Sequence, residues 1–290
     1  MPTGIETNPV MHEPFPLDLF LYQYNRQIGY GLSREDVQCT TFRSRKHATV
    51  EINVFYRADE IEHNFNDTII AKHFDSSSQD RKSLEHDVLV RASASGIAVP
   101  GVLEVLDNFL LLEKVEGETL MDSINGSIFL GQKTKIVTGI ARWLASFHVA
   151  FASDPIARRR GDTNLRNFIV SPSGIITGID FEEASIDDPI NDLHEIVDSI
   201  LQSDPGIYSV TLDEIGWKFD LCENLLVQYL QSMNGRAMIL LESPETFVKG
   251  QVEVMKQLAY IRGKEVLLAE TLPGIESQLL KRMEHAFSLV

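Results

Sequence analysis

Three short segments stand out because their residue types, taken in chain order, suit the transfer of a phosphoryl group. The first ends in Lys72 after a short apolar run, the second is residues 161–167, and the third is residues 178–181. A lysine on a strand can bind nucleotide phosphates, a loop aspartate can orient an attacking hydroxyl, and an asparagine with a second aspartate can hold magnesium. Each segment alone is a weak signal, so the prediction depends on all three occurring in this order.

Four side chains in or directly after the second and third segments are the candidates for the chemistry itself. We expect Asp162 to be the catalytic base, which would accept a hydrogen bond from the acceptor hydroxyl and take its proton late in the transfer. Asn167 and Asp180 would offer oxygen ligands to Mg²⁺, which prefers hard oxygen donors. Glu182 is either a further metal ligand or an exposed charge at the end of a strand. The expected cofactor is therefore magnesium, with ATP or GTP as co-substrate.

Five predicted strands and one helix in the first half of the chain would position Lys72. Strand-like runs separated by turn signals occur at 37–42, 49–56, 68–74, 102–106 and 109–113. A helical pattern between the third and fourth runs ends near Gly96. Glu85 lies on the apolar stripe of this helix, so we expect it opposite Lys72 in the nucleotide site, with Asp87 as the competing partner.

The second half of the chain has mainly helical periodicity. Residues 133–151 have the pattern of a long amphipathic helix, and helical patterns continue after Asp192. Between them, a loop at 158–167 precedes a predicted strand pair at 168–170 and 175–179. This asymmetry predicts two lobes after an N-terminal extension: 1–15 for the extension, 16–114 for a nucleotide-binding N-lobe, and 115–290 for a C-lobe with the catalytic loop, metal and acceptor.

Composition limits the classes of function. The chain has 290 residues and a formal net charge of −16 at pH 7, which argues against a nonspecific nucleic-acid binder because such proteins need a basic face. Its two cysteines, Cys39 and Cys222, form no zinc or disulfide pattern. The sequence contains no signal-peptide pattern and no apolar run as long as a membrane span. We therefore expect a cytoplasmic protein with neither a membrane nor a nucleic-acid partner.

Three further segments resemble the aminoglycoside phosphotransferase and choline kinase branch of the protein-kinase-like fold. They are residues 110–120 after the predicted fifth strand, the helix end at 144–148, and residues 179–193, which contain Asp-Phe and then Asp-Pro-Ile-Asn-Asp-Leu. The resemblance implies an α+β protein of two lobes. The N-terminal lobe would be an antiparallel sheet with one helix, and the C-terminal lobe would be mainly helical.

The resemblance also implies roles for four more residues. Glu113 and Val115 lie where backbone groups of the family contact adenine, so we expect them in the nucleotide site. His148 matches the end of the family's Leu-x-x-Leu-His helix, where we expect a buried, hydrogen-bonded histidine. Asp192 matches the aspartate that braces the catalytic loop.

Two departures from the family pattern bear on turnover. The family usually has His-Gly-Asp where this chain has Arg160-Gly161-Asp162, and arginine cannot accept a hydrogen bond, so the loop must be braced differently. Arg160 and its two preceding arginines would be solvated, or would contact a phosphate or a bracing carboxylate. The turn at 43–47, expected to cover the phosphates, has no glycine, and its cations, Arg45 among them, could bind phosphate instead.

Three functions stay open at this point. The leading one is a kinase that transfers the γ-phosphate of ATP or GTP to a hydroxyl of a small molecule, because the short interval from Asp180 to Asp192 leaves no room for a peptide-docking activation segment. Residues 161–169 also resemble the catalytic loop of atypical protein kinases of the RIO-like or KEOPS-associated type. The third is a nucleotide-binding pseudokinase that scaffolds a complex, which Arg160 and the glycine-free turn would favour.

Overall fold

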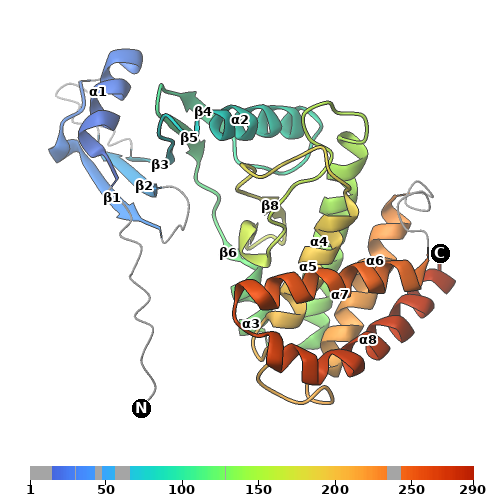
Figure 1. Cartoon of the computed structure of the whole chain (residues 1–290). Coiled ribbons are helices and arrows are strands. Elements are labelled where there is room, and N and C mark those ends of the chain that lie inside the picture. The colour runs from blue at the N-terminus through green and yellow to red at the C-terminus, as the bar shows by residue number, and fades with distance from the viewer. Residues whose placement is uncertain (1–14, 30, 43–47, 56–65, 128, 234–242) are drawn as a thin grey trace, which may run out of the picture. The chain divides into compact units, whose positions relative to one another are not determined.

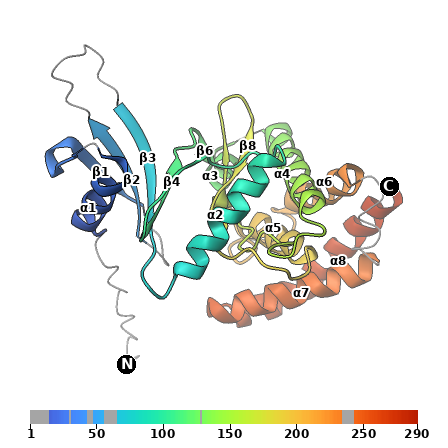
Figure 2. The same ribbon diagram turned by 90° about the horizontal axis from the view of Figure 1, so that it is seen from above.

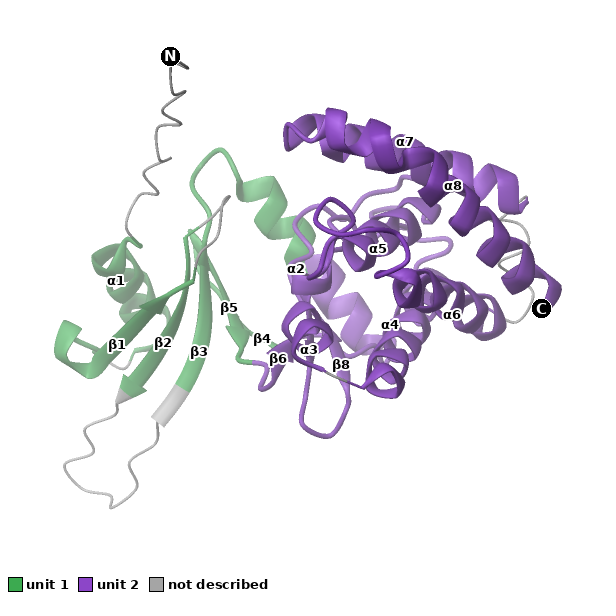
Figure 3. Ribbon diagram, turned by 90° about the horizontal axis from the view of Figure 1, so that it is seen from below, with its two compact units in different colours: residues 1–86, 101–114 green, residues 87–100, 115–290 purple. Residues whose placement is uncertain are grey.

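The computed structural model describes residues 15–29, 31–42, 48–55, 66–127, 129–233 and 243–290. The chain forms two compact units (Figure 3). Unit 1 comprises Met1–His86 and Gly101–Lys114, and unit 2 comprises Asp87–Pro100 and Val115–Val290. The turn at 43–47, with Arg45, and residues 1–14 lie outside the described residues.

Unit 1 contains a five-stranded antiparallel sheet (Figure 1). Its elements are α1 (Leu17–Ile28), β1 (Val37–Thr41), β2 (Thr49–Phe55), β3 (Asn66–His73), β4 (Val102–Val105) and β5 (Phe109–Glu113). The strand order is β1-β2-β3-β5-β4, and every neighbouring pair is antiparallel. All five predicted strands are confirmed, whereas α1 was not predicted.

Helix α1 packs against one face of this sheet, beside β1 and β2 (Figure 2). Phe20 of α1 is fully buried and meets the ring of Phe109 edge-on, with ring centroids 5.6 Å apart. Ile52 and Ala71 belong to the same apolar cluster. Side chains alternate between the faces of a strand, so Lys72, the neighbour of Ala71, lies on the opposite face from α1.

Helix α2 (Gln79–Ala94) contains the boundary between the two units, which falls after His86. Glu85, Val88, Leu89 and Ala92 are all buried, as the predicted stripe requires. Gly96 follows the helix with φ +75°, a conformation that glycine adopts without steric cost.

Unit 2 combines a small antiparallel sheet with a set of packed helices (Figure 1). Its elements are β6 (Glu118–Thr119), α3 (Leu120–Gly126), α4 (Leu130–Ala150), β7 (Phe168–Val170), β8 (Ile176–Gly178), α5 (Ile190–Gln202), α6 (Gly216–Ser232), α7 (Pro244–Ile261) and α8 (Glu265–Ser288). The predicted long helix and strand pair are confirmed by α4, β7 and β8. Within the described ranges, no helix is long and apolar enough to cross a membrane.

A cluster of aromatic rings fixes the segments on either side of the β7–β8 pair. Trp143 of α4 donates its indole N–H to the carbonyl of Ala98 (2.9 Å) and meets the ring of Phe168 edge-on at 5.2 Å. The Phe147 ring stacks on that of Phe181, 6.0 Å between centroids. Phe168 directly follows residues 158–167, the candidate catalytic loop, and Phe181 follows Asp180, so the core of unit 2 positions both candidate catalytic segments.

Candidate active site

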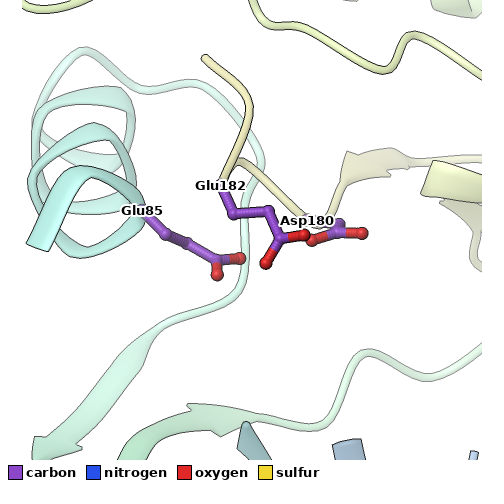
Figure 4. Close-up of side chains that lie close together, drawn as sticks. All are labelled: Glu85, Asp180 and Glu182. Carbon is purple, nitrogen blue, oxygen red and sulfur yellow. The ribbon is translucent and has the colours of Figure 1, made fainter. Parts of the chain in front are cut away.

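In unit 1, Lys72 and Glu85 form a buried ion pair. The Nζ of Lys72 lies 2.6 Å from Oε2 of Glu85, and the two residues are 6% and 0% exposed. Removing two charges from water is costly, so such a pair requires close geometry. Glu85 projects from α2 (Figure 4), and β3 supplies Lys72. Of the five residues predicted for the nucleotide site, these two are in direct contact.

The other predicted nucleotide-site residues are placed as follows. Glu113 is the last residue of β5 and is exposed. Val115 is half-buried and is the first residue of unit 2 after β5. In the described part of the chain, the Val115 backbone pairs with no other backbone group, which suits the role expected of it toward a nucleotide base. Arg45 lies outside the described residues.

In unit 2, Asp192 holds the catalytic loop through both of its oxygens. Oδ2 accepts from the backbone N–H of Arg160 (2.6 Å) and from Nε2 of His148 (3.0 Å). Oδ1 accepts from the hydroxyl of Thr163 (2.7 Å) and the N–H of Gly161 (3.1 Å). Complete burial acts to raise the pKa of Asp192, but the hydrogen bonds from His148, Thr163 and Arg160 outweigh it and hold that pKa below its ordinary value.

Asp162 and Asp180 have unusual backbone conformations. Their φ angles are +39° and +65°, and among the described residues they are the only two outside glycine with positive φ. For a residue with a Cβ, this conformation costs about 1–3 kcal/mol and tends to persist where function requires it. The side-chain amide of Asn167 donates to the carbonyl of Asp162 (2.9 Å). Two of the four candidate catalytic and metal residues, Asp162 and Asp180, thus have this strained backbone conformation, and Asn167 is hydrogen-bonded to Asp162.

The carboxylates of Asp180 and Glu182 turn toward each other beyond the end of β8 (Figure 4), with oxygens within 4.8 Å. Glu182 is only 4% exposed, so it is a buried carboxylate and not an exposed charge. Because the amide nitrogen of Asn167 is engaged by Asp162, its oxygen is left as an acceptor. Two carboxylates and an amide oxygen make a hard donor set that fits Mg²⁺.

Arg160 replaces the expected histidine, and its side chain points into the core of unit 2. The residue is fully buried, and its guanidinium lies 4.7 Å from the Phe168 ring centroid and 5.0 Å from that of Phe181. The guanidinium donates to five backbone carbonyl oxygens, those of Gly161, Asp162, Asn167, Ile179 and Asp180. Arg160 therefore ties the catalytic loop to the segment after β8. The Arg160 side chain is therefore neither solvated nor placed to contact a phosphate, the first two of the alternatives that the sequence left open.

Two residues that support the loop were missed from the sequence. Glu195 accepts from the backbone N–H of Thr163 (2.8 Å) and pairs with the guanidinium of Arg159. The hydroxyl of Tyr229 on α6 bonds to Nδ1 of the buried His148 (2.9 Å). Glu195 lies three residues after Asp192 on α5 and so shares its face, a spacing that would have indicated its position. Tyr229 gave no local signal because it is 81 residues from its partner.

Asp162 borders a cavity of about 640 Å³ enclosed by the catalytic loop, α5 and α7. Glu195 and Asp198 line it from α5, and Val254 and Leu258 line it from α7. This volume is in the usual range for small-molecule sites. The structure thus places the candidate base at the edge of a space that can hold a small molecule.

Burial sets the charge state of two groups in this cavity. Burial lowers the pKa of His194 to about 4, so the imidazole is neutral near pH 7. Burial raises the pKa of Asp198 to about 6, although hydrogen bonds from Gln202 and the charge of Arg262 partly offset it. Near neutral pH the histidine is therefore uncharged, whereas the carboxylates of Glu195 and Asp198 are paired with Arg159 and Arg262, which line the same cavity.

Comparison with solved structures identifies the fold, whereas comparison of the sequence finds no match. No protein-family profile matches the sequence, and no curated protein does. The structure is similar to aminoglycoside phosphotransferase APH(3'')-Id from Streptomyces rimosus, solved with ADP and streptomycin, with a TM-score of 0.54 and 15% identity over 76% of this chain and 95% of that chain. A choline kinase from Cryptosporidium parvum gives a TM-score of 0.54 and 12% identity over 94% of this chain and 95% of that chain.

An aminoglycoside-3'-phosphotransferase of type VIII is similar as well, with a TM-score of 0.52 and 13% identity over 69% of this chain and 88% of that chain. Together these similarities confirm the predicted protein-kinase-like fold, with its antiparallel N-terminal sheet and mainly helical remainder. At 12–15% identity they establish the fold alone.

Proposed function

We propose that the protein is a Mg²⁺-assisted phosphotransferase that moves the γ-phosphate of ATP or GTP to a hydroxyl group of a small molecule. The observation that supports it most directly is that the only positive-φ residues outside glycine, within the described ranges, are Asp162 and Asp180. These are the residues that the sequence assigns to the base and the metal. The fold shared with small-molecule kinases supports the same reading.

In this proposal each residue has a separate task. Lys72, fixed by Glu85, binds the nucleotide phosphates, while the chain around Glu113 and Val115 contacts the base. Asp162 hydrogen-bonds the acceptor hydroxyl and takes its proton. Phosphoryl transfer needs alignment more than covalent help, so the hydrogen bonds that fix the loop contribute by keeping Asp162 in place.

Magnesium would be held by Asn167, Asp180 and Glu182. When bound, it neutralises charge on the transferring phosphoryl group. The acceptor would occupy the cavity beside Asp162, where it meets carboxylates of α5 and apolar side chains of α7. Carboxylates outnumber cations in the lining of this cavity, which contains Asp162, Glu183, Glu195, Asp198 and Glu253 against Arg159 and Arg262. This excess favours an acceptor with hydrogen-bond donors or positive charge.

The test is transfer of radiolabelled γ-phosphate from ATP or GTP to a panel of sugars, amino alcohols, hydroxyamino acids and aminoglycosides. Asp162→Asn should lower the transfer rate by about 10²–10⁴-fold, the usual contribution of a general base, with nucleotide affinity retained. Asp213→Asn, which changes an exposed carboxylate before α6, should leave the rate unchanged. A full rate in Asp162→Asn would contradict the proposal.

Two other results would replace the proposed small-molecule kinase with one of the alternative functions. Label on the protein itself, with none on any acceptor, would identify a protein kinase of the RIO-like or KEOPS-associated type. Nucleotide binding without turnover on any acceptor would identify a pseudokinase scaffold.

A further inference from the structure

Helix α7 carries a stripe of residues that runs from the core of unit 2 to the wall of the cavity beside Asp162. The members of this stripe are three or four positions apart and so share one side of the helix: they are Phe247, Gln251, Val254, Leu258 and Ile261. The first two are buried, whereas the last three line the cavity. The stripe therefore leaves the core at the cavity.

The three cavity residues of this stripe are apolar and only partly covered. Val254 and Leu258 are half-buried, and Ile261, the last residue of α7, is 75% exposed. A single exposed apolar side chain is common, but here the exposed residue ends a row whose other members are more deeply buried. Removing apolar surface from water is favourable. These three side chains therefore favour an occupant of the cavity that has an apolar part.

The polar residues that line the cavity from α7 lie apart from this apolar surface. Glu253 and Gln257 are both exposed. At about 100° of rotation per residue, both lie on the opposite side of α7 from the buried Met255, whereas Leu258 lies near it. Glu253 also pairs with Lys256, with 2.8 Å from Nζ to Oε1. The polar residues thus form the outer rim of the α7 wall, and the apolar residues form its inner side.

The α5 side of the cavity is polar, and two of its carboxylates already have a counter-charge. Glu195 pairs with the guanidinium of Arg159, and Oδ2 of Asp198 lies 3.6 Å from Nη1 of Arg262. Because these carboxylates are paired, the cavity does not require a charged group along the whole length of a ligand. The cavity is therefore amphipathic, with polar groups on α5 and the catalytic loop and an apolar inner side on α7.

We propose that the acceptor in this cavity is amphiphilic, with its hydroxyl at Asp162 and an apolar chain along Val254, Leu258 and Ile261. The hydroxyl end rests on the phosphotransferase function proposed above, whereas the apolar contact is a binding property that can be measured without turnover. From Val254 to Ile261, α7 rises about 10 Å. An extended chain advances roughly 1.2 Å per bond, so this wall matches a chain of about eight carbons.

The test is isothermal titration of the full chain, without nucleotide, with 2-amino-1-butanol and 2-amino-1-octanol. The two compounds share a head group and differ by four methylene groups. A fully buried methylene group tightens binding about fourfold. Along an open wall we expect half of that free energy, so the wild type should bind the octanol about 15-fold more tightly than the butanol.

Two substitutions in the wall should remove most of this gain. In Leu258→Ser/Ile261→Ser the octanol should bind only about threefold more tightly than the butanol, while the dissociation constant of the butanol changes less than about twofold. Val266→Ser/Leu267→Ser is the matched control, because both residues are exposed, on α8, and neither lines the cavity. The control should keep the 15-fold gain. Ile261→Ser alone changes an exposed side chain and should lower the gain to about sixfold.

Three outcomes would overturn the inference. They are the absence of saturable binding by the wild type, equal dissociation constants for the two compounds, and an unchanged gain in Leu258→Ser/Ile261→Ser. Thermal unfolding of each variant, with a transition as cooperative as that of the wild type, excludes loss of fold as the cause.

Transfer of γ-phosphate separates this inference from the proposed function. The full gain in binding with no transfer to either compound would support the apolar contact and contradict the phosphotransferase. Transfer to short polar acceptors with no gain from the apolar chain would support the phosphotransferase and overturn the amphiphilic acceptor.

Discussion

Replacing Arg160 by methionine removes all five hydrogen bonds that join the catalytic loop to the segment after β8 while keeping a long apolar side chain. The carbonyls of Asp162 and Asn167 retain other donors, from Asn164 and Ile179 among others. Within the described ranges, the carbonyls of Gly161 and Ile179 have no donor other than Arg160. Two buried carbonyls would thus lose their only hydrogen bond.

An unsatisfied buried carbonyl costs about 1–3 kcal/mol, so the loss amounts to about 2–6 kcal/mol. Relief of the cost of burying the guanidinium, whose pKa is lowered by that burial, offsets part of it. We therefore expect the free energy of unfolding of Arg160→Met to fall by about 2–4 kcal/mol, measured by urea denaturation with an unchanged m-value. Arg158→Met is the control, since Arg158 is exposed and its side chain, among the described residues, donates only to the Ile186 carbonyl.

Arg158→Met should lower the free energy of unfolding by less than about 1 kcal/mol. If Arg160→Met proves as stable as Arg158→Met, the guanidinium does not hold the loop and the reasoning fails.

Two further predictions concern buried charges. Glu85→Gln should lower the free energy of unfolding, measured in urea, by about 3–5 kcal/mol, because it removes the buried counter-charge of Lys72. Adding Lys72→Met to this variant should recover most of the lost stability. A double variant as unstable as the single one would contradict the explanation. The buried Asp198 has a folded pKa of about 6 against 3.8 as its ordinary value. Because the unfolded chain releases this proton at lower pH, Asp198 should lower the free energy of unfolding by roughly 2.4 kcal/mol as the pH rises from 4 to 7. Asp198→Asn should lack that decline in denaturation measured across this range, and an identical pH profile in the two proteins would refute it.

The residues that could be assigned from sequence are those whose signal is local. The base and metal candidates lie in short motifs. The five strands are short strand-like runs between turn signals, and α4 follows from helical periodicity. The pairing of Lys72 with Glu85 was also accessible, because Glu85 shares the stripe that is buried on α2. In each of these cases the sequence pattern that supports the prediction lies within a single helix, strand or loop.

Features that depend on distant segments were not accessible. Helix α1 was missed for a different reason, because seven of its twelve residues are apolar or aromatic. Its buried residues Phe20, Leu21 and Tyr24 recur at helical spacing, so the periodicity that predicted the other helices was present here and was overlooked. The sequence showed that Arg160 cannot accept a hydrogen bond, but not that its guanidinium turns inward between two rings to reach carbonyls up to 20 residues away. The cavity beside Asp162 likewise combines elements from across unit 2.

The most direct test of the central claim is thermal unfolding with ATP or GTP, with and without magnesium, for the wild type, Asp180→Asn and Asp213→Asn. At a hundred times its dissociation constant, nucleotide should stabilise the wild type by roughly 2.7 kcal/mol. We predict a magnesium-dependent rise in the unfolding temperature that Asp213→Asn retains and Asp180→Asn loses. No rise at saturating nucleotide, or the same rise in Asp180→Asn, would contradict a nucleotide and metal site built around Asp180.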